Sequence, residues 1–130
     1  MSRGRFVVPG SPDHQAMLLN NQACDLCRMG KYEEAKPLFV QALAIWEKHF
    51  GETSLPVATC HESLVMLAGA IGDFDDAIVH CQNAVRILDK LPNVDPGEHA
   101  TFRGILARLQ ASDGVTLESF KDVARRSWTR

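Results

Sequence analysis

A closely spaced pair of cysteines is the first feature of this 130-residue chain that could support metal binding or redox chemistry. Cys24 and Cys27 lie three residues apart in a stretch with helical periodicity, so both thiols face one side of a helix. They could form half of a zinc site, completed by Cys60–His61 or by His80–Cys81. Tetrahedral ligation would then need side chains from several helices, and no second closely spaced cysteine pair exists. We therefore expect packing roles and no metal.

No arrangement of acid, base and nucleophile can be placed in the sequence. The five histidines are scattered, at positions 14, 49, 61, 80 and 99. The patterns Gly-x-Ser-x-Gly and His-Glu-x-x-His and a phosphate-binding glycine loop are absent. We expect no catalytic residues, no cofactor and no enzymatic activity.

Composition places the chain among ordinary soluble globular proteins. It is 45% hydrophobic with a formal net charge of −2. Its longest apolar run is far shorter than the roughly 20 residues that span a bilayer. The apolar run within residues 1–10 is also too short to be the core of a secretory signal. We expect a cytoplasmic protein with free thiols, for which nucleic acid, a membrane and a small-molecule substrate are not the expected partners.

One stretch of the sequence recurs after 42 residues: Gly30, which precedes it, has its counterpart in Gly72, since 30 plus 42 is 72. Residues 31–51 read KYEEAKPLFVQALAIWEKHFG, with apolar residues three or four apart, which is typical of an amphipathic helix. The positions that recur in one register are Gly30 with Gly72, Tyr32 with Phe74, Glu34 with Asp76, Ala35 with Ala77, Ala42 with Ala84 and Ile45 with Ile87.

Each repeating unit is predicted to be a helical hairpin, with a turn at Gly30 in the first and at Gly72 in the second. Adding 42 again gives Gly114, so residues beyond 95 form a third, degenerate unit. We expect a flexible segment at residues 1–12 and one repeat domain at 13–130, with repeats at about 13–52, 53–94 and 95–130. The predicted fold is all-α, a right-handed α-solenoid of three hairpins whose third hairpin is a cap.

The segment from Leu19 to Thr53 resembles the tetratricopeptide repeat (TPR) of the kinesin light chain type, which also has a 42-residue unit. The period alone also allows a HEAT or armadillo array, at about 40–47 residues. The pattern glycine, aromatic, alanine, present as Gly30-Tyr32-Ala35 and again from Gly72, favours the TPR. The resemblance implies a fold without chemistry of its own, which binds proteins or peptides in a groove lined by the first helix of each hairpin.

The resemblance also implies which residues line that groove. In the family, paired asparagines help to hold peptides; they are present here as Asn20-Asn21, whereas the next repeat has Glu62-Ser63. The predicted peptide would be extended or helical, with one acidic residue and one large side chain. The predicted groove residues are Met17, Asn20, Asn21, Cys24, Cys27 and Arg28, then Thr59, Glu62, Met66, Gly69 and Ala70, and then Thr101, Gly104, Arg108, Ala111 and Ser112.

The C-terminal stretch has a separate apolar stripe, formed by Phe120, Val123, Ala124 and Trp128 beside basic residues. It is predicted to close the last hairpin, and the alternative is a surface for a membrane, an RNA backbone or a second copy of the chain. The expected function is that of an adaptor or scaffold that binds a peptide segment of another protein. The alternatives are a self-association module, which makes a homo-oligomer possible, and a regulatory TPR arm of a larger multidomain protein.

Overall fold

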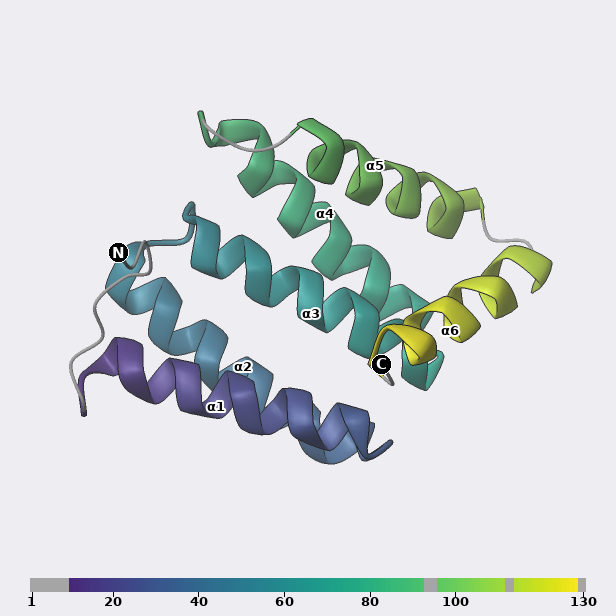
Figure 1. Ribbon diagram of the computed structural model, residues 1–130. Helices are drawn as coiled ribbons and strands as arrows, with labels where there is room; N and C mark the ends of the chain where they lie inside the picture. Colours follow the sequence, from purple (N-terminus) through teal and green to yellow (C-terminus); the bar gives the residue numbers. More distant parts are fainter. Residues whose placement is uncertain (1–9, 93–95, 112–113, 129–130) are drawn as a thin grey trace.

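A computed structural model describes residues 10–92, 96–111 and 114–128 of the chain. Within these ranges the chain forms six α-helices, and the first four of them follow one another as antiparallel neighbours (Figure 1). The predicted flexible segment falls largely on residues 1–9, which lie outside the described ranges, and the first helix already begins at residue 12. The helices are α1 (Pro12–Arg28), α2 (Tyr32–Phe50), α3 (Leu55–Ile71), α4 (Phe74–Lys90), α5 (Pro96–Ala111) and α6 (Gly114–Trp128).

The helix boundaries follow from capping and glycine chemistry. The Ser11 side chain accepts a hydrogen bond from the His14 backbone N–H at 3.1 Å, which caps the start of α1. Gly72 adopts a left-handed conformation with φ of 95° between α3 and α4, a conformation that favours glycine. The predicted hairpin turns at Gly30 and Gly72 are therefore confirmed.

The core is built around α3, which packs against α2, α4 and α6. Ten of its residues are buried, including Leu64 and Leu67, whereas the first helix buries four. Small side chains let the helices approach closely, since Ala35, Ala42 and Ala77 have no exposed surface. This burial explains why the alanines recur in register in the sequence.

A phenylalanine and a cysteine fill each junction between successive repeats. In the first junction the phenylalanine comes from the earlier helix and the cysteine from the later one, and in the second junction this order is reversed. Phe39 on α2 and Cys60 on α3 belong to one cluster of buried residues, and Cys81 on α4 and Phe102 on α5 belong to another. In both junctions the thiol donates to the phenylalanine carbonyl oxygen, at 3.4 Å and 3.2 Å. Because 39 plus 42 is 81 and 60 plus 42 is 102, the large and small side chains swap helices but keep the summed volume.

The last helix differs from the sequence prediction in its packing. We expected α6 to close a third hairpin with α5, but it packs mainly on α3 and only slightly on α5 (yellow in Figure 1). The sequence supplies a physical reason. Thr116 stands where the first two repeats have Tyr32 and Phe74, so α6 lacks the aromatic residue with which those hairpins are packed.

Candidate peptide-binding groove

The predicted groove residues of α1 differ in how far their side chains are exposed. Met17 is 37% exposed, Asn21 and Arg28 are exposed, and Asn20 and Cys24 are half-buried. The Asn20 amide nitrogen lies 4.0 Å from the Cys24 sulfur, and Arg28 forms a 2.7 Å ion pair with Asp25.

Cys27 is an exception among the predicted groove residues of α1. It has no exposed surface and belongs to the core, so its assignment to the groove is wrong. Cys27 lies in line with the buried Ala16 and Ala23, which stand eleven and four residues before it, so it belongs to the buried side of α1.

One predicted residue of α3 and one of α5 border the same pocket. Glu62 and Met66 on α3 are half-buried, and Arg108 on α5 is exposed. Met66 and Arg108 border one pocket of about 290 Å³, although 42 residues separate them in the sequence. The pocket lining is Met66, Ile105, Arg108, Leu109, Ser119, Phe120 and Val123. We call the side of α1, α3 and α5 that carries Met17, Asn20, Cys24, Glu62, Met66 and Arg108 the groove face.

Helix α6 lies over the end of α3 at the groove face, which the sequence did not predict. The Phe120 ring and Ala124 contact Gly69 so closely that a β-carbon added there would lie 2.4 Å and 3.0 Å from them. Arg125 Nε donates to the Ala70 carbonyl oxygen at 2.9 Å. Gly69 and Ala70, expected in an open groove, are therefore buried.

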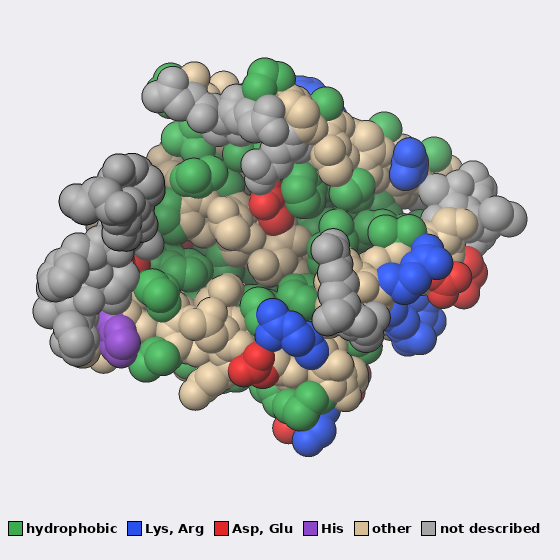
Figure 2. Space-filling view, viewed as in Figure 1, with side chains coloured by type: hydrophobic (Ala, Val, Ile, Leu, Met, Phe, Trp, Pro, Cys, Tyr) green, Lys and Arg blue, Asp and Glu red, His purple; other side chains and the backbone are tan. Residues whose placement is uncertain are grey.

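The space-filling view shows the character of this surface (Figure 2). Uncharged side chains, hydrophobic or polar, cover most of the side seen in Figure 1, and basic side chains gather toward α6. Leu18 is 49% exposed and Val123 is 47% exposed.

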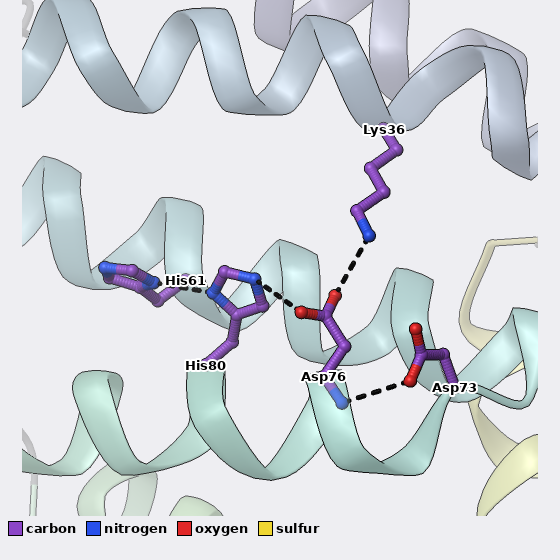
Figure 3. Close-up of polar contacts among 5 residues, drawn as sticks. All are labelled: Lys36, His61, Asp73, Asp76 and His80. Carbon is purple, nitrogen blue, oxygen red and sulfur yellow. Dashed lines mark hydrogen bonds and ion pairs between the residues drawn. The ribbon is translucent and has the colours of Figure 1, made fainter.

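A chain of polar contacts links α2, α3 and α4 (Figure 3). His61 Nδ1 and His80 Nδ1 are 3.0 Å apart, so one donates to the other. His80 Nε2 lies 3.6 Å from Asp76 Oδ1, and Lys36 Nζ lies 3.3 Å from Asp76 Oδ2. The Asp76 backbone N–H donates to the Asp73 carboxylate at 3.2 Å, which caps α4.

Burial lowers the pKa of both imidazoles in this chain of contacts. It lowers the pKa of His61 to about 4, helped by the neighbouring His80 and by Arg86. Burial also lowers the pKa of His80, against the opposing effect of Asp76. The two histidines are 19 positions apart in the sequence, and the pairing of α3 with α4 brings them into contact.

The thiols are placed for packing. All four cysteines are free, and burial raises the pKa of Cys27 and of Cys60 to about 12 and that of Cys81 to about 11. Cys24 is half-buried, and burial raises the pKa of its thiol as well. Within the described ranges no three or more of the His, Cys, Asp and Glu side chains lie together as metal ligands would.

The described helices also include none that is long and apolar enough to cross a membrane. The groove face carries apolar side chains and amide groups, and Arg108 borders its pocket. Such a surface can hold a peptide by hydrogen bonds and side-chain packing. Sequence reasoning missed the part that α6 plays in it, and the only signal was the apolar stripe of α6 itself.

Comparison with known proteins agrees with this fold. Residues 14–95 match the tetratricopeptide repeat family, and no curated protein matches the chain. The crystal structure of BtubC (BKLC) from P. vanneervenii, a kinesin light chain-like TPR protein, is similar with a TM-score of 0.74 and 27% sequence identity. The match covers 91% of this chain and 49% of BtubC, so the chain spans about half the length of that protein. The chain belongs to the tetratricopeptide repeat family.

Proposed function

We propose that this chain is a protein–protein interaction module, an adaptor or scaffold, that binds a peptide segment of a partner on the groove face. TPR repeats are in general modules for binding proteins and are not typically enzymes. The observation that supports the proposal most is the pocket of about 290 Å³ that Met66 and Arg108 border from different helices. An apolar pocket with one convergent charged group is a common form of binding site.

The chemistry of the groove face defines the peptide. Arg108 presents a guanidinium group that can take a carboxylate with two hydrogen bonds, and Met66 with Leu109 can hold one large apolar side chain. Asn20 and Asn21 carry amide groups suited to the backbone of an extended or helical segment. The expected ligand therefore has one large apolar residue and one acidic residue.

The test is retention of partner proteins from a cell lysate by the full chain and by two variants. The double substitution Asn20→Ala, Arg108→Ala should lose the partner and keep its helical circular dichroism. Asn83→Ala, Arg86→Ala removes the same two residue types from α4, where they bond to each other at 3.3 Å, and should retain the partner. If the groove variant retains the same proteins as the wild type, the groove face is not the binding surface.

Self-association is the competing function. Light scattering on the wild-type chain distinguishes it, because a monomer at all concentrations leaves only a different protein as partner. A dimer that the groove substitutions abolish would instead assign the groove face to a second copy.

A further inference from the structure

We propose that the end of α3 on the groove face is a receptor for an amphipathic helix, and that α6 is a resident ligand which a partner helix must displace. The proposal rests on the proposed function for the existence of a partner. It does not depend on which partner that is, because α6 itself supplies the chemistry of the ligand.

The first support is the shape of the contact. Phe120, Ala124 and Trp128 are spaced by four residues and so lie on one side of α6. The Phe120 ring and the Ala124 methyl meet Gly69, where the surface has no side chain. The receptor thus has a notch at Gly69 that accepts a large side chain and, one turn later, a small one.

The second support is that both aromatic residues of α6 meet aromatic residues of other helices. The Trp128 ring lies with its centroid 6.0 Å from that of Phe39, and the Phe120 ring lies 6.4 Å from that of Phe74. Between them, Arg125 donates to the Ala70 carbonyl oxygen at 2.9 Å. An aromatic, small, aromatic pattern with a basic residue after the small one is therefore the recognised feature, a helix-in-groove mode of binding.

The third support is that α6 fits this receptor incompletely. Trp128 Nε1 is buried and has no hydrogen-bond partner among the described residues, and burying an unpaired donor opposes binding. The pocket of about 290 Å³ remains between α3, α5 and α6, and Val123 at its edge is 47% exposed. A partner helix that fills the pocket, and that supplies a hydrogen-bond acceptor for the buried donor or places no donor there, would bind better than α6. Such a helix could therefore displace α6.

The fourth support is the weak tie of α6 to its neighbour in the sequence. Helix α6 packs on α3 far more than on α5, which precedes it. Release from α3 therefore leaves the direct contacts of α5 with α4 in place, and α5 loses the packing of Phe120 and Leu117 against the clusters that contain Phe102 and Leu109. The ligand that we infer is a partner helix with α6-like spacing of aromatic, small and aromatic residues.

The test uses a fluorescent peptide with the sequence of residues 114–128 and measures its binding to the full chain by fluorescence anisotropy. In the full-length variant Phe120→Ala, Trp128→Ala the chain's own α6 is released, and Gly69 stays free for the peptide. We expect this variant to bind the peptide about tenfold or more tightly than the wild type, because a receptor occupied nine-tenths of the time loses about that factor in apparent affinity.

Two controls assign the binding to the receptor. Adding Gly69→Leu to the released variant should abolish binding, since the notch is then filled. A peptide with alanine at the position of Phe120 should bind neither chain. If circular dichroism shows that the double variant has unfolded, the single variant Trp128→Ala takes its place.

Equal affinity of the peptide for the wild type and the released variant would overturn the proposal, as would no binding to a folded released variant or full binding after Gly69→Leu. None of these results depends on capture of a partner. Failure here with a partner still lost in Asn20→Ala, Arg108→Ala would leave the proposed function standing and remove only the role of α6.

Discussion

Replacing Gly69 by alanine should separate two opposing effects that the structure allows us to estimate. In the interior of a helix, alanine is more favourable than glycine by about 1 kcal/mol. At Gly69, however, the new β-carbon would lie 2.4 Å from the Phe120 ring and 3.0 Å from the Ala124 methyl. Overpacking of this kind costs about 1–3 kcal/mol.

The Phe120 ring borders a pocket and can yield in part, whereas Ala124 can move only with the whole of α6. We therefore expect Gly69→Ala to leave the free energy of unfolding unchanged or to lower it by up to about 2 kcal/mol, the overpacking minus the helix propensity.

Gly104 provides the matched control for this measurement. It also lies inside a helix, but a β-carbon there would meet nothing within 4 Å. Gly104→Ala should therefore raise the free energy of unfolding by about 1 kcal/mol. Urea unfolding followed by circular dichroism measures both variants. An equal rise in the two would refute the contact between α6 and α3.

A double variant isolates the cause. With Phe120→Ala already present, the larger of the two clashes at Gly69 is removed. Adding Gly69→Ala should then be stabilising or neutral, so the two substitutions should be coupled by more than about 0.5 kcal/mol. Additive effects would show that Phe120 does not lie on Gly69.

Three further predictions follow from burial and packing. Acidification from about pH 7 to pH 5 should lower the free energy of unfolding by about 2 kcal/mol, because His61 takes up a proton near its ordinary pKa of 6.5 in the unfolded chain but only near pH 4 in the folded chain. The substitution His61→Gln should make the free energy of unfolding depend less on pH in this range. An equal pH dependence in the wild type and in this variant would contradict the prediction. A thiol reagent near pH 8 should modify the half-buried Cys24 before the three buried thiols, whose pKa values lie at about 11 to 12, and mass spectrometry of the digested protein would reveal any other order. Cys60→Phe should cost about 1–3 kcal/mol by overpacking, and Phe39→Cys in the same chain should recover part of it, which chemical denaturation of the single and double variants would measure; purely additive losses would speak against volume exchange.

Much of the fold was predictable because it depends on local signals. Gly30 and Gly72 mark the turns in the sequence, and the recurrence of Ala35 as Ala77 places two buried helix contacts in one register. These features work through helical periodicity and backbone conformation, which a sequence displays directly.

The place of α6 was not predictable by the same means. Its stripe fixes which side of the helix is buried, but not the partner, because α3 and α5 both offer apolar surface. The choice depends on the fit of Phe120 against Gly69, a contact between residues 51 positions apart. The contact of His61 with His80 and the burial of Cys27 likewise depend on how the helices are rotated against each other.

The central claim is that α6 lies on α3 at the groove face, and nuclear Overhauser contacts of the Phe120 ring test it most directly. In the isotopically labelled full chain, we predict contacts from the ring protons of Phe120 to the α-protons of Gly69. In a third hairpin Phe120 would instead contact Ala100 and Ala107 of α5, which stand 84 residues (two repeats) after the buried Ala16 and Ala23 of α1. Those contacts, in the absence of contacts to Gly69, would contradict the account.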